Sequence, residues 1–306
     1  MLYPTHKANG KLLLTSEYFV LDGANAIALP TKFGQTLFVT LSQEAGFFIH
    51  WIGLDSSGNS WIELFFDTKL LPSQMNDMGQ RLSDVLKVCI DLNPDKLQLE
   101  KSYVFTTEID FDRSWGLGTS STLISLLADF FNINPYLLLE KTFGGSGYDI
   151  ACARAEGPLL YNNKNAFNPE VKPISFYKSF SESIYFAYLG NKQNSRDGIQ
   201  HYKSRSFDKI AVIEKLEEIN QRILKSEQLS DFELALEEHE QIISENLNIP
   251  RLSDTLFIDY WGSVKSLGAW GGDFILLTNT KSSEELESYL DSKDIQVVFP
   301  FADIIL

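Results

Sequence analysis

Apolar side chains recur along this chain at two spacings, and each spacing predicts a different kind of element. Short runs of apolar and β-branched residues predict strands at residues 11–14, 26–29, 36–41, 61–66, 97–111, 184–189, 274–277 and 295–299. Apolar residues three and four positions apart predict helices at residues 74–92, 123–131, 135–142, 150–155 and 210–224. Capping-box pairs, Ser230 with Glu233 and Ser282 with Glu285, predict the starts of two further helices.

These elements alternate without the regular rhythm of a doubly wound sheet, so the expected class is mixed α+β. The chain of 306 residues is long enough for one large or two medium domains. A stretch rich in asparagine and proline at residues 162–173 is the expected connection. We therefore predict two domains, residues 1–173 and residues 174–306.

Composition and charge limit the kind of partner. Hydrophobic residues make up 44% and charged residues 22%, as in ordinary soluble globular proteins. The net charge of -15 argues against a nucleic-acid partner, whose surface normally requires a basic patch. The negative net charge does not exclude an anionic small-molecule ligand, because backbone amides, a few cations and Mg²⁺ create a local positive site. No apolar run approaches the roughly 18 residues of a membrane span, and two cysteines favour a reduced, cytoplasmic setting.

The residues 115–122, Trp-Gly-Leu-Gly-Thr-Ser-Ser-Thr, are the strongest candidate for chemistry. They follow a predicted strand and open a predicted buried helix. Gly116 and Gly118 permit a tight turn and close approach of a ligand, and the hydroxyl residues behind them would cap the helix. The unpaired amides at a helix start, at the positive end of its dipole, suit a phosphate. An ordinary capped turn has the same pattern, so a second motif is needed to decide.

Three other glycine-containing segments supply that support. Residues 10–23 place Lys11 at a strand start, ahead of a glutamate and a tyrosine. Residues 144–151 place Asp149 at a helix start, where it would accept a hydroxyl proton, steer a cation or simply cap the helix. Residues 268–274 form a third glycine-rich turn before a strand. The standard nucleotide-binding fingerprints and zinc-ligand spacings do not occur in the sequence.

In this order the segments resemble the motifs of the GHMP kinases, the superfamily of small-molecule kinases that includes galactokinase, homoserine kinase, mevalonate kinase and phosphomevalonate kinase. The resemblance covers nearly the whole chain, and the Gly-Ser-Gly-Tyr-Asp stretch is most similar to the mevalonate and phosphomevalonate branch. It implies a two-domain α+β fold, with an N-terminal domain like domain 2 of ribosomal protein S5 and a ferredoxin-like C-terminal domain. It also implies ATP and Mg²⁺ as cofactors, and an active site between the domains.

Carried over residue by residue, the resemblance implies several roles. Asp149 would be the catalytic aspartate, and Lys11 would lower the pKa of the attacked hydroxyl or support Asp149. The residues that would wrap the ATP phosphates are Trp115, Gly116, Leu117, Gly118, Thr119, Ser120 and Ser121. Those that would hold Mg²⁺ are Ser120 and Glu140. Those that would bind the substrate are Glu17, Tyr18, Ser146, Lys192, Ser195, Arg196, Gly271 and Gly272. A solvated loop is the alternative interpretation of residues 190–196.

Some positions depart from the family pattern. Asn9 stands where the family commonly has proline, and Ser16 where it commonly has glycine. The usual proline before Gly116 is replaced. Trp270 and Asp273 interrupt a motif that is normally richer in glycine and small residues. A side chain as large as that of Trp270 is expected to narrow the space near the substrate or the phosphates.

The expected function is therefore ATP-dependent phosphorylation of a small acidic metabolite, of the mevalonate or phosphomevalonate type, in isoprenoid biosynthesis. Two alternatives stay open. One is an enzyme like diphosphomevalonate decarboxylase, which uses similar residues, and the other is a non-catalytic ligand-binding sensor on a kinase fold. The expected partner is a small molecule, with no nucleic acid and no membrane. A homodimer stays open, because the sequence does not fix the oligomeric state.

Overall fold

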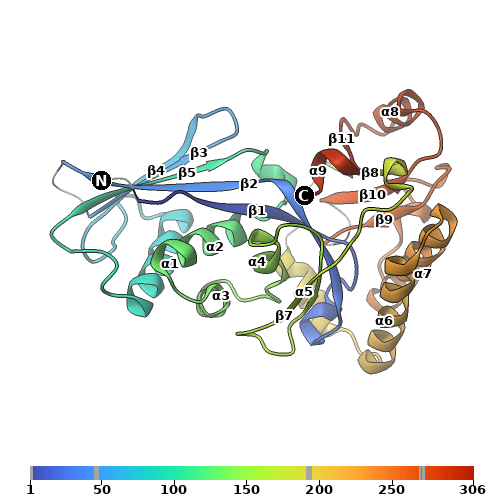
Figure 1. Ribbon diagram of the computed structural model, residues 1–306, viewed down its shortest axis with the longest axis horizontal. Helices are drawn as coiled ribbons and strands as arrows, with labels where there is room; N and C mark the ends of the chain where they lie inside the picture. The colour runs from blue at the N-terminus through green and yellow to red at the C-terminus, as the bar shows by residue number, and fades with distance from the viewer. Residues whose placement is uncertain (1–2, 45–47, 191–194, 269, 271–272) are drawn as a thin grey trace.

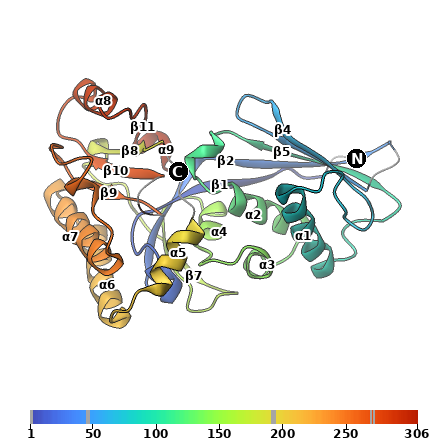
Figure 2. The same ribbon diagram turned by 180° about the vertical axis from the view of Figure 1, so that it is seen from behind.

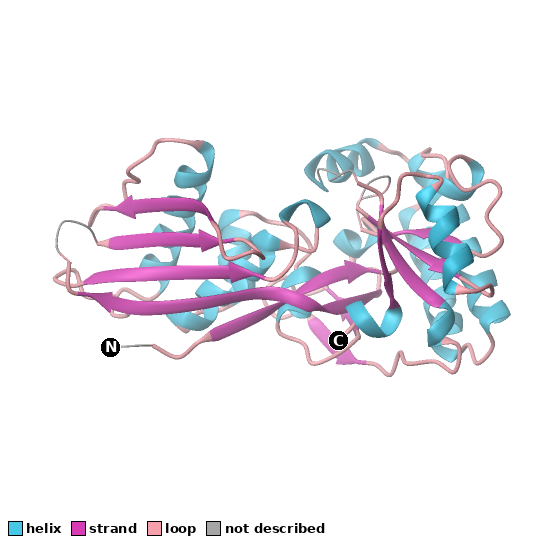
Figure 3. Ribbon diagram, turned by 90° about the horizontal axis from the view of Figure 1, so that it is seen from above, coloured by secondary structure: helices cyan, strands magenta, loops and turns pink. Residues whose placement is uncertain are grey.

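The computed structural model describes residues 3–44, 48–190, 195–268, 270 and 273–306 (Figure 1). The chain forms two β-sheets that lie side by side along the long axis of the molecule (Figure 3). The first half of the chain builds one sheet, and the remainder builds the other. Within the described ranges, the helices are too short or too polar to cross a membrane.

The first sheet has seven strands among the described residues, in the order β4-β3-β5-β2-β6-β7, with β1 paired to β2. The strands are β1 (His6–Leu13), β2 (Ala26–Ser42), β3 (Ile49–Leu54), β4 (Ser60–Phe66), β5 (Ser102–Ile109), β6 (Leu159–Asn162) and β7 (Glu170–Pro173). The two strands predicted at 26–29 and 36–41 are one continuous strand, β2. This strand tolerates no side chain at Gly34, because a Cβ there would collide with the carbonyl oxygen of Ala8 in β1.

Four helices cover one face of this sheet (Figure 1): α1 (Asp77–Leu92), α2 (Thr119–Phe131), α3 (Pro135–Thr142) and α4 (Tyr148–Ala153). They begin close to where the apolar pattern predicts. The Asn76 side chain caps α1 by accepting a hydrogen bond from the amide of Gly79. The predicted apolar stripe of α1 faces the core from Leu82 onward, whereas Met78 lies in the first turn and is 42% exposed.

The second sheet has four antiparallel strands among the described residues, in the order β11-β8-β10-β9. They are β8 (Ile184–Tyr188), β9 (Val264–Ser266), β10 (Phe274–Thr278) and β11 (Val297–Pro300). The helices α5 (Ser195–Ser204), α6 (Lys209–Lys225) and α7 (Leu229–Leu247) connect β8 to β9, and α8 (Ser283–Asp291) connects β10 to β11. Helices that join split strand pairs in this order make the ferredoxin-like topology that the resemblance implies.

Short elements complete the chain: the 3-10 turns η1 (Phe19–Asp22), η2 (Arg113–Trp115), η3 (Ser181–Ser183) and η4 (Leu252–Asp254), and the final helix α9 (Phe301–Ile304). After α9, the amide of Leu306 donates to the carbonyl of Pro30 in β2. The C-terminal segment is therefore anchored on the first sheet. One buried apolar cluster includes Leu12 and Leu29 of the first sheet together with Phe186 and Leu276 of the second. The two sheets thus share hydrophobic packing.

Several local predictions need correction. The capping box of Ser282 with Glu285 is confirmed, but the pair Ser230 and Glu233 does not cap α7. That helix begins at Leu229, and Glu233 instead accepts a hydrogen bond from the hydroxyl of Thr278. The predicted connection at 162–173 contains β7, whose four residues are all exposed and so lack an apolar signature. The domain boundary after residue 173 stays a prediction.

Candidate functional site

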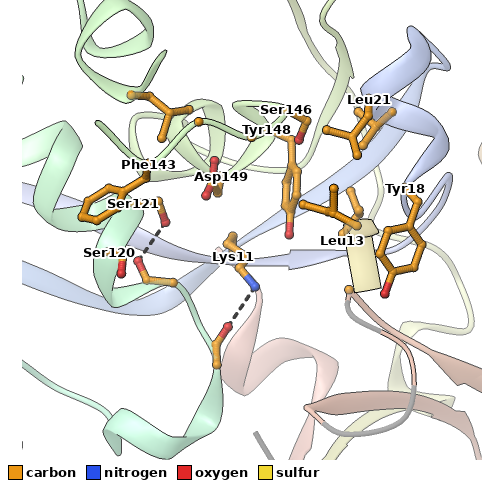
Figure 4. Close-up of a pocket in the computed structure, with 18 of the residues that line it drawn as sticks. Lys11, Leu13, Tyr18, Leu21, Ser120, Ser121, Phe143, Ser146, Tyr148 and Asp149 are labelled. Atoms are coloured by element: carbon orange, nitrogen blue, oxygen red, sulfur yellow. Dashed lines mark hydrogen bonds between the residues drawn. The ribbon is translucent and has the colours of Figure 1, made fainter. Parts of the chain in front are cut away.

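A cavity of about 310 Å³ lies where the two halves of the chain meet (Figure 4). Strand β1, the start of α2, the segment before α4, helix α5 and the turn before β10 contribute to its lining. Seen from behind, α5 lies between the two halves (Figure 2), and its Ile199 lines the cavity. The sequence-predicted site residues in the lining are Lys11, Tyr18, Gly116, Gly118, Thr119, Ser120, Ser121, Ser146 and Asp149.

The glycine turn before α2 exposes the start of that helix to the cavity. Gly116 and Gly118 adopt φ values of +69° and +100°, a region that favours glycine. The prediction that hydroxyl side chains cap α2 is wrong, because Gly118 itself is the N-cap and no side chain caps the helix. The hydroxyl of Ser121 instead donates back to the carbonyl of Gly118, at 2.8 Å. The first amides therefore remain available at the positive end of the helix dipole.

Lys11 and Asp149 lie beside this helix start. The Lys11 ammonium donates to the carbonyl of Gly116 at 2.8 Å, and its backbone amide donates to the carbonyl of Leu117 at 3.0 Å. Strand β1 is thereby fixed to the glycine turn. Asp149 is in the first turn of α4, after Gly147. Burial raises the pKa of Asp149, while the Lys11 charge and a hydrogen bond from Ser121 act in the opposite direction.

The opposite end of the cavity is apolar and aromatic. In Figure 4, Leu13, Tyr18 and Leu21 lie on the far side of Lys11 and Asp149 from the α2 start. The Tyr18 ring stacks on Tyr202 of α5, with 5.8 Å between ring centroids and 18° between planes. Burial raises the pKa of Tyr18 to about 12, so its hydroxyl stays protonated at neutral pH.

Other predicted residues lie outside the lining. Glu140 is exposed on α3, and the Leu117 side chain is fully buried in the core. Trp115 packs edge-on against Phe33 and Phe299. Lys192, Gly271 and Gly272 are outside the described residues, as are the side chains of Ser195 and Arg196.

Trp270 does not narrow the cavity as its size predicts. It is buried, with 6% of its surface exposed, in a cluster that includes Tyr18, Tyr202 and Leu216, and it is not among the lining residues. The neighbouring Asp273 does line the cavity, and its carboxyl carbon lies 2.6 Å from where a Cβ of Gly116 would stand. The sequence singled out Asp273 only as a departure from the family pattern.

Glu17 is turned away from the cavity, into a buried charged cluster. Its carboxylate accepts a hydrogen bond from the Lys265 ammonium at 2.5 Å, and Lys265 also donates to Glu240 at 3.1 Å. All three side chains are at most 1% exposed. Ligand atoms of Glu17, His239 and Glu240 lie within 4.8 Å of one another, close enough to share a metal ion. The ammonium of Lys265 already supplies the cation, so we do not interpret the cluster as a metal site.

Sequence reasoning missed Lys265, His239 and Glu240. They lie on β9 and α7, far along the chain from Glu17, and no local motif connects these segments. Their only signal in the sequence is indirect. Lys265 shortly precedes the glycine-rich turn at 268–274, and His239 and Glu240 occupy positions on the amphipathic helix α7.

This chain has the two-domain α+β fold of the GHMP kinases, as the sequence motifs predict. Its structural neighbours include a mevalonate kinase and a phosphomevalonate kinase. It aligns with the mevalonate kinase of Methanococcus jannaschii over 97% of both chains, at 17% identity and a TM-score of 0.69. It aligns with the Streptococcus pneumoniae phosphomevalonate kinase, in complex with phosphomevalonate and AMPPNP, over 97% of this chain and 99% of that chain, at 15% identity and a TM-score of 0.72.

A third neighbour carries out a different reaction. The mevalonate diphosphate decarboxylase of Staphylococcus aureus aligns over 100% of this chain and 95% of that chain, at 11% identity and a TM-score of 0.61. No family model matches the sequence, and no curated protein matches it. At these identities the likeness establishes the fold, and the reaction must be argued from the site.

Proposed function

We propose that this protein transfers the γ-phosphoryl group of ATP to a small acidic metabolite of the mevalonate or phosphomevalonate type. The observation that carries the proposal is the convergence of Lys11, Asp149 and the uncapped start of α2 in one cavity. Phosphoryl transfer requires mainly positioning of the reactants and neutralisation of charge on the transferred group. A helix start, a lysine and a carboxylate supply both functions at one place.

In this proposal residues 115–121 wrap the ATP phosphates. The amides at the start of α2 would donate to phosphate oxygens, as helix starts commonly do. Lys11, held against Gly116, would add the positive charge that the amides alone lack. The solved phosphomevalonate kinase with this fold binds the ATP analogue AMPPNP, which is consistent with ATP as the phosphoryl donor here.

The cavity also offers oxygen donors of the kind that Mg²⁺ prefers. Ser120 is exposed on the cavity wall, and the carboxylates of Asp149 and Asp273 line the same space. Bound Mg²⁺ would neutralise charge on the phosphates. We therefore propose Ser120 as a Mg²⁺-binding residue. Glu140 remains the second proposed Mg²⁺ ligand; its side chain is exposed on α3, next to Leu139, which lines the cavity.

Asp149 is the proposed catalytic residue. Its carboxylate would orient the acceptor hydroxyl and take its proton late in the transfer. The acceptor would occupy the end of the cavity beyond Asp149, beside Tyr18 and Ser146. Lys192, Ser195, Arg196, Gly271 and Gly272 remain proposed substrate contacts, because their side chains or positions are not described.

The first experiment measures ADP release from Mg²⁺-ATP in the presence of mevalonate, phosphomevalonate, diphosphomevalonate, sugars or homoserine. We expect one acid of the mevalonate series to stimulate ADP release. Absence of ATP binding in calorimetry would remove the kinase proposal. ATP binding without stimulation by any acceptor would favour a ligand-binding sensor on this fold.

A substitution at Asp149 tests the catalytic assignment. Asp149→Asn is expected to lower turnover by about 10²- to 10⁴-fold, because the amide cannot accept the proton. The dissociation constant for ATP should stay within about twofold, since the phosphate contacts come from α2 and Lys11. Asp129→Asn is the matched control, because Asp129 lies on α2 and pairs with Arg154 outside the cavity. Near-normal turnover of Asp149→Asn would contradict the assignment.

The decarboxylase among the structural neighbours supports one second candidate, ATP-driven decarboxylation of a diphosphorylated acid. The same assay separates the two reactions. Release of CO₂ together with ADP from diphosphomevalonate would identify the decarboxylase. ADP release without CO₂, from mevalonate or phosphomevalonate, would identify the kinase.

A further inference from the structure

The end of β1 and the segment that follows it are held by the second half of the chain at several residues. The carbonyl of Leu13 accepts a hydrogen bond from the amide of Gly268, at 3.3 Å. The amide of Ser16 donates to Nε2 of His239 in α7, at 2.9 Å. These contacts come from the turn after β9 and from α7. A segment of the first sheet is therefore shaped by elements that lie more than 200 residues away in sequence.

The backbone of this segment is strained. Ser16 and Tyr18 both adopt φ of +62°, in the left-handed region that glycine favours. Each such residue is less stable than in an ordinary conformation and persists only where surrounding contacts enforce it. Glu17 lies between these two residues, so a contact that fixes Glu17 can enforce both.

The buried ion pair provides that contact. The Glu17 carboxylate and the Lys265 ammonium are 0% exposed and 2.5 Å apart. Removing one member of a buried pair leaves an uncompensated charge and is strongly unfavourable. Movement of Glu17 away from β9 would remove one of the two carboxylates that contact the Lys265 ammonium and would leave only Glu240 of α7.

The residue that this arrangement presents to the cavity is Tyr18. Its ring lines the cavity on the side of Lys11 and Asp149 opposite the α2 start (Figure 4). Tyr202 supports the ring from behind by stacking. Its hydroxyl lies against Gly198 of α5, where a Cβ would collide with it. The ring is thus held between the strained turn and α5.

We propose that Glu17 and Lys265 are positioning residues, whose buried ion pair fixes the strained turn that presents the Tyr18 ring to the acceptor end of the cavity. Glu17 then influences acceptor binding through Tyr18, without touching the acceptor. The assignment of an acceptor end rests on the proposed kinase function, whereas the positioning of Tyr18 rests on the contacts alone. Two readouts test these parts separately.

The first readout needs no substrate. Hydrogen exchange of the backbone amides in residues 14–22 reports how firmly the turn is held. Lys265→Met and Glu17→Ala are expected to speed this exchange by about tenfold. Glu17→Gln should stay within about twofold of the wild type, because its amide oxygen still accepts from Lys265. Lys293→Met is the control, since it removes an ion pair with the exposed Asp259 in the same half of the chain.

Should Lys265→Met fail to fold, the double variant Glu17→Gln/Lys265→Met removes the pair at nearly constant side-chain volume. The same acceleration of exchange is expected there, because a methionine side chain donates no hydrogen bond. Unchanged exchange at residues 14–22 in a folded variant without the ammonium would overturn the proposal.

The second readout uses the acceptor found in the ADP-release assay. Lys265→Met is expected to raise KM for the acceptor by about tenfold and KM for ATP by less than about twofold. Tyr18→Ala should likewise raise KM for the acceptor much more than KM for ATP. Equal increases in KM for the acceptor and KM for ATP would overturn the proposed role of the ion pair in acceptor binding. If no acceptor exists, the proposed function fails, and the exchange measurement still decides whether the ion pair positions Tyr18.

Discussion

At the scale of single residues, the fold changes the chemistry of the buried carboxyl of Glu17. Burial raises its pKa from the usual 4.5 to about 7, against the opposing charge of Lys265. Glu240 faces the same ammonium and its pKa shifts in the same direction, while burial lowers the pKa of the neighbouring His239. Between pH 4.5 and 7 the folded protein therefore binds more protons at Glu17 than the unfolded chain does.

This difference predicts a pH dependence of stability. Because the folded state binds the extra proton, the free energy of unfolding should fall as pH rises from about 5 to 7, by at most about 1.4 kcal/mol per pH unit for this group. Glu17→Gln should remove that component. The measurement is urea unfolding of both proteins across this range. Identical slopes for the wild type and Glu17→Gln would contradict the assigned pKa.

At the scale of elements, the turn before α2 combines a left-handed backbone with close neighbours. Gly118 has φ of +100°, and a Cβ there would lie 2.7 Å from the Ser121 hydroxyl and 3.2 Å from Cγ of Lys11. Glycine is therefore required at position 118, both because φ is positive and because a Cβ would have no room. Local sequence reveals this glycine as part of a turn, but the crowding arises from Ser121 of α2 together with Lys11 of β1.

Gly118→Ala is accordingly expected to lower the free energy of unfolding by about 1–3 kcal/mol and to weaken ATP binding about tenfold. Calorimetry with ATP and urea unfolding provide the two measurements. Gly58→Ala is a matched control, because Gly58 has φ of +78° but a Cβ added to it would meet no atom within 4 Å. The control should lose stability without losing ATP affinity, and equal loss of affinity in both variants would argue against phosphate binding at Gly118.

Elements with a strong local pattern could be predicted, and weakly patterned ones could not. Helices α2, α3 and α6 have apolar faces that a short window of sequence reveals. Strand β9 has only three residues and β7 is entirely exposed, so neither shows the alternation of apolar and polar residues that predicts a strand. Both are strands because a neighbouring strand supplies hydrogen-bond partners.

At the scale of the whole molecule, Trp270 belongs to the packing between the two halves. Its buried ring shares a cluster with Phe19 and Ala24 of the first half and with Leu216 and Ile243 of the second. The size of this side chain and its position in a glycine-rich motif predict that it narrows the space near the substrate or the phosphates. The tertiary structure instead gives the tryptophan a structural role behind Tyr18.

Trp270→Ala is therefore expected to lower the free energy of unfolding by about 3–5 kcal/mol, through lost packing and the space left behind. The range of accepted substrates should not widen, because Trp270 is outside the cavity lining. Urea unfolding and the ADP-release assay with larger acceptors measure the two effects. A variant of normal stability that accepts larger substrates would show that Trp270 does limit the cavity.

The α+β class, most helices and strands, and the glycine turns that surround Lys11 and Asp149 could all be predicted from the sequence, because they depend on neighbours within a few residues. The motifs also placed Tyr18, Ser120 and Ser146 among the site residues, and these line the cavity. Three outcomes required the folded molecule: Glu17 faces Lys265, 248 residues away, the Glu140 side chain is exposed, and Trp270 is buried. They depend on which distant side chains meet when the two sheets pack, and a one-dimensional pattern does not contain that information.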